Sequence, residues 1–124
     1  MCSSDLETRR WVIPKGWPMK GLSGPKSAER EAFEEAGVEG AIADKPIGTY
    51  TYAKRARSGA IQTLSVEVFP MLVETERKNW PERNERVRRW ASVDDAAAAV
   101  DEPELKQIIV AFGAARARKA TVRA

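Results

Sequence analysis

Residues 16–38 read GWPMKGLSGPKSAEREAFEEAGV, and this stretch contains signals for both the start and the end of a helix. Pro25 suits the first turn of a helix, where its missing N–H has no partner to lose, and Ser23 or Gly24 can cap that turn. Gly37 is a natural left-handed stop for a helix. We therefore expect a helix that begins at Pro25 and ends at the residue before Gly37.

The expected helix carries three glutamates on one flank, Glu31, Glu34 and Glu35. Like charges three or four residues apart on a helix cost about 0.2–0.5 kcal/mol per pair. Glu34 and Glu35 also lie in the last turn, where the helix dipole disfavours anions by about 0.3–1 kcal/mol each. Several unfavourable electrostatic terms therefore act on the same turn of the helix, and this indicates a functional site. Mg²⁺ or Mn²⁺ would relieve them, since hard cations prefer carboxylate oxygens. The spacing alone leaves a solvated acidic face as the alternative.

The whole segment resembles the Nudix box, GX5EX7REUXEEXGU, in which U is aliphatic. The matching residues stand at the required spacings without gaps: Gly16, Arg30, Glu31, Glu34, Glu35, Gly37 and Val38. The lead-in WVIPKGW and the later RRWAS are also similar to the family. The PKG segment most resembles the diphosphoinositol-polyphosphate and diadenosine-polyphosphate hydrolase branch. Two positions depart from the pattern, because Leu22 stands where the family has its first box glutamate and Ala32 is small for the aliphatic position.

The resemblance implies an α/β (α+β) fold, a Nudix-type α/β/α sandwich with a mixed β-sheet, as a single domain over residues 1–124. Only ten residues precede Trp11, so we expect part of the N-terminal strand to be missing. A sheet edge left unpaired in this way can pair with the edge of another chain, so a homodimer is one expected assembly.

The implied activity is that of an enzyme acting on acid anhydrides in phosphorus-containing compounds. The resemblance implies a metal-dependent pyrophosphohydrolase that cleaves a diphosphate linkage by water attack on phosphorus, with Mg²⁺ or Mn²⁺ as cofactor. The expected substrate is a nucleotide-type or polyphosphorylated small molecule, with diadenosine polyphosphates or inositol pyrophosphates favoured. An RNA 5′ pyrophosphohydrolase and a non-catalytic binding module on the same scaffold are the alternatives.

The resemblance also implies roles for individual residues. The implied metal ligands are three glutamates and one backbone segment: Glu31, Glu34, Glu35 and Lys15–Gly16. One of the glutamates activates the attacking water instead, with Glu34 and Glu31 as the catalytic candidates. Arg30 is expected to orient a glutamate. A further acid from the loop before a late strand often completes such sites, and we expect Glu85 in this role, with Glu82 as the alternative.

Positively charged side chains are candidates for a rim that binds the polyphosphate, because both lysine and arginine bind phosphate well. The candidates are Lys15, Lys20, Lys54, Arg55 and Arg57. The last three can equally form an exposed hairpin tip. Glu67 lies between two valines of an expected strand and faces away from them, toward solvent or toward the site.

The remaining elements follow from hydrophobic patterning and turn residues. Strands are expected at residues 11–13, 47–54, 64–73 and 86–91, with Pro70 marking an edge or bulge. A hairpin connects the second and third of these, and a helix capped by Ser92 is expected to run to Ala99. A last helix is expected over residues 103–115, followed by a basic and frayed tail that begins at residue 113.

Composition narrows the chemistry further. The chain has no histidine and one cysteine, which excludes histidine-based catalysis and zinc clusters. Residues 113–124 carry four bases and no acid, while the other 112 residues carry 17 bases and 18 acids, so the net charge of +3 is a property of the tail. Nucleic acid is therefore the less favoured partner. With no signal sequence or membrane-length apolar run, we expect a cytoplasmic protein without a membrane partner.

Overall fold

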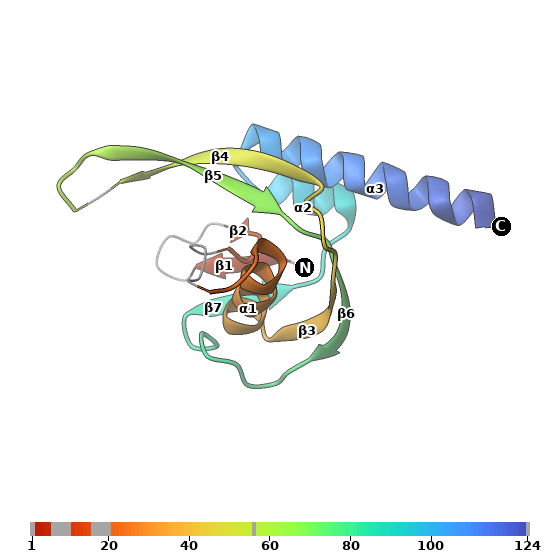
Figure 1. The fold of residues 1–124 in the computed structure, drawn as a ribbon, viewed down its shortest axis with the longest axis horizontal. Coiled ribbons are helices and arrows are strands. Elements are labelled where there is room, and N and C mark those ends of the chain that lie inside the picture. The colour runs from red at the N-terminus through yellow and green to blue at the C-terminus, as the bar shows by residue number, and fades with distance from the viewer. Residues whose placement is uncertain (1, 6–10, 16–20, 56, 124) are drawn as a thin grey trace.

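The computed structural model describes residues 2–5, 11–15, 21–55 and 57–123. Figure 1 shows a mixed α/β architecture in which one hairpin and one long helix extend beyond the rest of the chain. The elements follow one another as β1 (Cys2–Asp5), β2 (Trp11–Val12), α1 (Gly24–Ala36), β3 (Val38–Ile42), β4 (Gly48–Arg55), β5 (Ile61–Val68), β6 (Met71–Glu76), β7 (Arg86–Arg89), α2 (Val93–Ala99) and α3 (Pro103–Arg123).

Helix α1 has the caps that its sequence predicts. The Ser23 hydroxyl accepts a hydrogen bond from the Lys26 amide at 3.3 Å. Gly37 adopts the left-handed conformation, with φ of 65°, and its amide donates to the Phe33 carbonyl at 2.9 Å. Local capping chemistry thus defines both ends of the helix that carries the three glutamates.

The sheet arrangement differs from the single mixed sheet that we expected. In the described part of the chain the strands form three separate ladders, all antiparallel, in the orders β2-β1-β7, β3-β6 and β4-β5. The strand expected over residues 64–73 is divided into β5 and β6, because Pro70 has no N–H to give to a ladder. Backbone bonds from Ala43 to Pro70 and from Ile47 to Val68 continue the pairing across the break.

The N-terminal end also differs from expectation. Cys2–Asp5 form β1, a strand that the sequence did not predict, which pairs with β2 on one side and β7 on the other, while the expected loss of part of the N-terminal strand stays a prediction. Serine has only modest strand propensity, so the short segment CSSD reads as a loop in isolation. Pairing on both sides satisfies its backbone groups and makes it a strand.

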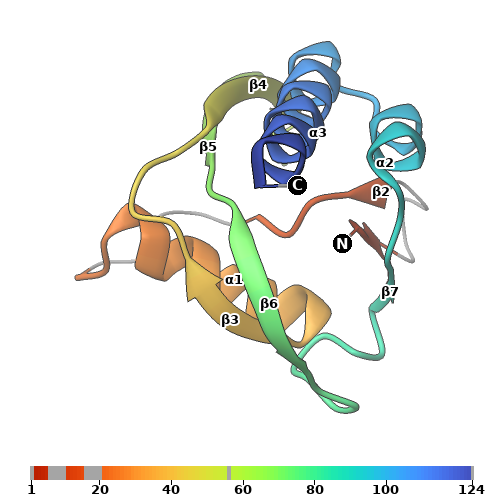
Figure 2. The same ribbon diagram turned by 90° about the vertical axis from the view of Figure 1, so that its right-hand side faces the viewer.

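The core lies between the β4–β5 hairpin and the C-terminal helices. Tyr50, Val100 and Leu105 are its fully buried side chains, and aliphatic residues of β5 and α3 pack against them. Figure 2 shows β3 and β6 lying across α1, while β4 and β5 lie next to α3. The two ladders on either side of Pro70 therefore cover different helices.

Helix α3 is longer than expected. We predicted an end near Ala115 and a frayed tail from residue 113, but the helix continues to Arg123. Gly113 does not end it, and the alanines and basic residues that follow are strong helix formers. No helix in the described part of the chain is both long and apolar enough to cross a membrane.

A glycine in β3 offers a test of the ladder geometry. A Cβ at Gly40 would lie 1.9 Å from the Leu72 carbonyl oxygen, next to the register shift between Glu39 and Gly40. The clashing oxygen belongs to the backbone and cannot move aside as the end of a flexible side chain can. Gly40→Ala should therefore lower the free energy of unfolding by about 3 kcal/mol. Ala41→Val, at an exposed position of the same strand, should change it by less than about 0.5 kcal/mol. Urea unfolding of both variants measures the difference, and equal stabilities would contradict this register.

Candidate functional site

The carboxylate of Glu35 is buried, with 5% of the residue exposed, near the end of α1. Its Oε2 atom accepts a hydrogen bond from the backbone N–H of Lys15 at 2.6 Å. Its Oε1 atom accepts one from Nη2 of Arg86 at 2.9 Å. Glu35 thus joins three parts of the chain: the segment after β2, helix α1 and the start of β7.

Burial raises the pKa of Glu35 to about 7, from a usual value of 4.5. The Arg86 guanidinium and the Lys15 amide act in the opposite direction, while the negative charges of Glu82 and Glu31 raise the pKa further. The protein therefore holds this carboxylate where its charge is only partly compensated.

Glu31 lies one turn before Glu35 on the same helix, and Glu34 directly precedes Glu35. Burial raises the pKa of Glu31, and the charges of Glu34 and Glu82 add to this effect. The Oε1 atom of Glu34 lies 3.4 Å from Nε of Arg30, so Arg30 contacts a glutamate as the resemblance implies. Both partners are partly exposed, and such surface pairs contribute little to stability. Leu22, which replaces the family glutamate, is exposed.

Glu82, which the sequence analysis ranked second, is the later acid that the structure brings to this cluster. Its Oε1 atom lies 3.2 Å from Nε of Arg86, so one guanidinium bridges Glu82 and Glu35. Glu85 is exposed, and its backbone amide donates to the Glu82 carbonyl at 2.9 Å. Glu85 therefore stays a prediction from the resemblance.

Sequence reasoning missed Arg86 as a member of the site. The segment RVRR was correctly expected to be a strand, and side chains in a strand alternate between its two faces. Arg86 and Arg88 therefore share one face, which is half-buried, while Val87 and Arg89 are exposed on the other. The spacing of four between Glu82 and Arg86 was the further signal that could have drawn attention to this pair.

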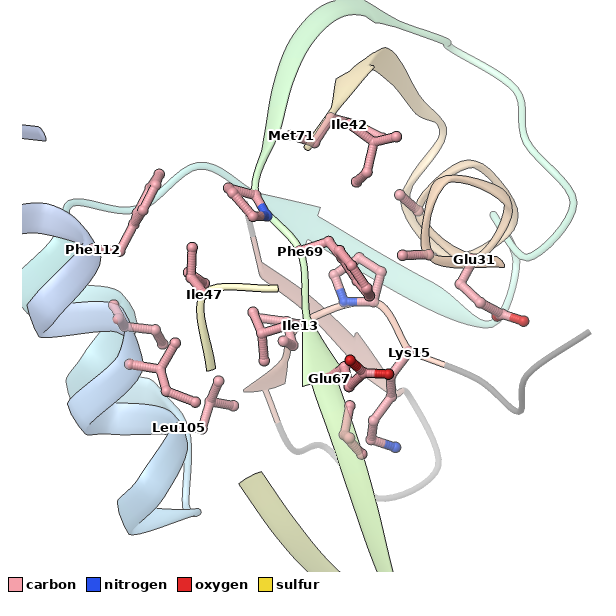
Figure 3. Close-up of a pocket in the computed structure, with 18 of the residues that line it drawn as sticks. Ile13, Lys15, Glu31, Ile42, Ile47, Glu67, Phe69, Met71, Leu105 and Phe112 are labelled. Atoms are coloured by element: carbon pink, nitrogen blue, oxygen red, sulfur yellow. The ribbon is translucent and has the colours of Figure 1, made fainter. Parts of the chain in front are cut away.

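A cavity of about 480 Å³ lies next to the glutamate cluster. Figure 3 shows aliphatic and aromatic side chains around it, including Ile13, Ile47 and Phe69. Among the described residues that line it, the charged ones are Lys15, Glu31 and Glu67. From the sequence, the Glu67 side chain could face either solvent or the site. In the structure Glu67 lines the cavity.

The cluster fits a divalent cation by its chemistry. The side-chain atoms that could bind a cation are the carboxylate oxygens of Glu31, Glu34, Glu35 and Glu82. Repulsion among these carboxylates contributes to the raised pKa of Glu31 and Glu35. Within the described residues, no three acidic or sulfur side chains form a ready-made metal cage. Mg²⁺ needs none, because it usually binds one or two carboxylates together with waters and substrate phosphates.

The expected cationic rim is only partly described. Gly16 and Lys20 lie outside the described residues, and so do the side chains of Lys54 and Arg55 near the end of β4. Arg57 is exposed in the turn after β4, at the tip of the hairpin that projects in Figure 1. These phosphate-binding roles stay predictions.

Sequence comparison finds relatives for most of the chain. The NUDIX domain model matches residues 3–112. Nudix hydrolase 4 of Arabidopsis thaliana is 35% identical over 101 residues, which cover 82% of this chain and 47% of that protein. The mitochondrial Nudix hydrolase 12 of the same plant is 34% identical over 90 residues, covering 68% and 43%. The chain thus spans about half the length of the curated relatives it matches.

Structure comparison shows the same fold. A binary complex of an Ap4A hydrolase from C. elegans aligns with a TM-score of 0.58 and 21% identity, covering 94% of this chain and 84% of that one. A second structure of C. elegans Ap4A hydrolase aligns with a TM-score of 0.56 and 18% identity, covering 91% and 82%. At these identities the likeness establishes the fold alone.

The raised pKa of Glu35 predicts a particular dependence of stability on pH. A carboxyl whose pKa is higher in the folded than in the unfolded chain favours folding below its unfolded pKa, and this contribution is lost as the pH rises through the folded value of about 7. The metal-free protein should therefore lose about 1 kcal/mol of unfolding free energy between about pH 6 and about pH 8 from this group.

Urea unfolding in EDTA at the two pH values measures this loss. Glu35→Gln should flatten the pH dependence, whereas Glu85→Gln, which alters an exposed carboxylate, should leave it as in the wild type. An equally steep dependence in the Glu35 variant would show that another group is responsible.

Proposed function

The chain belongs to the Nudix family, and on this basis we propose that it is a metal-dependent pyrophosphohydrolase acting on a nucleotide-type small molecule. One observation carries the proposal: a cluster of carboxylates around the buried Glu35 adjoins an apolar cavity of about 480 Å³. The cluster supplies ligands for a cation, and the cavity can take the part of the substrate that is not phosphate. Cytoplasmic location stays a prediction.

The proposed metal ligands are Glu31 and Glu35, supported by Glu34 and Glu82. A bound Mg²⁺ or Mn²⁺ would polarise a phosphoryl oxygen and acidify a bound water. Arg86 favours the ionised form of Glu35, which is the form that binds a cation. A backbone carbonyl at Lys15–Gly16 stays part of the proposal through the resemblance.

The remaining groups act on the attacking water and on the substrate. Glu34, or Glu31 instead of its role as a metal ligand, takes the proton from the water, and Arg30 contacts Glu34 at 3.4 Å. A carboxyl with a raised pKa suits this work, since a general base is most effective near the working pH. The pKa of Glu31 is raised in this way. Lys15 offers a point charge to phosphate at the cavity.

The lining of the cavity favours a nucleoside over an inositol polyphosphate. An inositol pyrophosphate carries phosphates around its ring and needs a concentration of cationic side chains. The described lining is mostly aliphatic and aromatic, with one lysine and two glutamates. Apolar walls with a few polar groups are typical of sites for flat organic ligands, and the volume lies in their usual range of about 300–1,000 Å³.

The activity itself is tested on the cluster. Glu35→Gln should lower kcat in Mg²⁺ by about 10³-fold, the loss typical when a group that stabilises the transition state is removed. Glu29→Gln changes another carboxylate of α1, which pairs with Lys26, and should leave kcat unchanged. Release of phosphate or nucleotide products with Mg²⁺, with Mn²⁺ and with EDTA provides the measurement. Turnover that survives EDTA, or a fully active Glu35 variant, would refute the proposed site.

The substrate class is tested at the cavity. Ser65 is exposed on β5 and lines the cavity, whereas Gln62 is exposed on the opposite face of the same strand. Ser65→Trp should raise KM for a diadenosine polyphosphate by about tenfold, since it blocks the space for the base, and Gln62→Trp should not. A panel that includes an inositol pyrophosphate and a 5′-triphosphate RNA completes the test. Preferential cleavage of either, or an unchanged KM for the Ser65 variant, would contradict a nucleoside in this cavity.

A further inference from the structure

Residues 77–88, here called the clamp segment, bind the backbone carbonyls at the end of α1. A helix leaves the carbonyl groups of its last turn without partners inside the helix. In this protein four consecutive carbonyls, from Glu34 to Gly37, each accept a hydrogen bond from the clamp segment. The donors are the Glu82 amide to Glu34 at 3.0 Å, Nε1 of Trp80 to Glu35 at 3.2 Å, Nη1 of Arg88 to Ala36 at 2.7 Å and the Arg77 amide to Gly37 at 2.8 Å.

Two side chains of the clamp segment form a single unit. The Arg88 guanidinium carbon lies 4.2 Å from the centroid of the Trp80 ring, which is cation–π geometry. Arg88 also places its charge at the negative end of the helix dipole, where a cation is stabilising. The space above Gly37 is filled by this pair, because a Cβ there would lie 2.8 Å from Arg88 and 2.9 Å from Trp80.

The same clamp segment delivers the charged groups that meet Glu35. Arg86 lies two residues before Arg88 on the same face of β7 and bonds to the Glu35 carboxylate at 2.9 Å. Glu82 lies two residues after Trp80 and bonds to Arg86 at 3.2 Å. The Trp80 indole bonds to the carbonyl of Glu35, the residue whose carboxylate Arg86 holds. The clamp segment therefore contacts both the main chain and the side chain of Glu35, and the Lys15 amide adds a further hydrogen bond to the carboxylate.

We propose that Trp80 and Arg88 are positioning residues for the metal site, and that their stack keeps the last turn of α1 in register with Glu82 and Arg86. This inference rests on the proposed function, because it assigns the pair to the cation site of that function. The hydrogen bonds of both side chains go to backbone carbonyls of the helix end, so both act through that end. Loss of the stack should spread the carboxylates apart and weaken metal binding in a protein that is still folded.

Mn²⁺ alone is the probe for the first measurement. Titration followed by electron paramagnetic resonance of free Mn²⁺ gives its Kd, and Arg88→Met should raise this Kd by about tenfold, as is typical when residues that support metal ligands are changed. Arg88→Lys keeps a cation at the helix end and should recover part of the affinity. Arg83→Gln is the matched control, since Arg83 is exposed in the clamp segment and bonds to Asn79. Thermal unfolding of each variant confirms that the assay temperature lies below Tm.

Trp80→Phe provides a second variant that keeps one aromatic ring but removes the N–H donor and the second ring of the indole. It should weaken Mn²⁺ binding less than Arg88→Met does. Folded Arg88→Met and Trp80→Phe proteins with wild-type affinity for Mn²⁺ would overturn the proposal, because a purely structural role lowers Tm without moving Kd.

A second measurement needs no metal and separates this proposal from the proposed function. The Lys15 amide bonds to the Glu35 carboxylate at 2.6 Å, so its proton resonance reports the position of that carboxylate. In metal-free protein this resonance should shift in Arg88→Met and stay in place in Arg83→Gln. If the wild type binds no Mn²⁺, the proposed function fails, and the Lys15 resonance alone decides whether the pair positions Glu35. An unmoved resonance would refute the positioning role.

Discussion

The site depends on the burial of one carboxylate, that of Glu35, against a guanidinium and a peptide N–H. Two unit charges 4 Å apart attract by about 4 kcal/mol at an effective dielectric constant of 20, and the Arg86 guanidinium supplies an attraction of this kind. Burial nevertheless raises the pKa of Glu35 to about 7, which shows that pairing does not fully offset the loss of water. A buried carboxylate that lowers the stability of the fold in this way is typical of a functional site rather than of a residue that serves only to pack the core.

The arrangement around Glu35 also explains why distant segments meet at the end of α1. The helix brings carboxylates that repel one another and carbonyls that lack partners. The clamp segment donates hydrogen bonds to these carbonyls from its backbone and side chains, and its Arg86 pairs with the Glu35 carboxylate. Lys15 adds the remaining contact from the segment after β2. The same contacts that complete a helix end therefore assemble a candidate cation site.

The break at Pro70 shapes the other half of the site. It separates the β3–β6 ladder, which covers α1, from the β4–β5 ladder, which covers α3. Phe69 and Pro70 at the break line the cavity, together with residues from both ladders and from α1, α2 and α3. A single continuous strand would hold the two ladders in one surface. The missing N–H of one proline thus contributes to the space that we propose for the nucleoside.

Features that depend on neighbouring residues could be predicted from the sequence alone. The limits of α1, its caps at Ser23 and Gly37, the shared flank of its three glutamates and the Ser92 cap of α2 all follow from local hydrogen bonding and helical periodicity. The family resemblance rests on the same local segment. β1 could not be predicted, because its residues have no strong strand propensity and its strand conformation depends on pairing with β2 and β7.

The distant groups that complete the site are brought together by the packing of the chain. Arg86 reaches Glu35 across 51 residues of sequence, and this contact depends on the register of β7 and on the path of the clamp segment. The same path brings Glu82 to the cluster and leaves Glu85 exposed, although both acids precede the same strand. The cavity likewise forms where residues of two ladders and three helices meet. Local rules set what each segment can offer, whereas chain packing selects the partners, because burial and charge pairing are properties of the assembled fold.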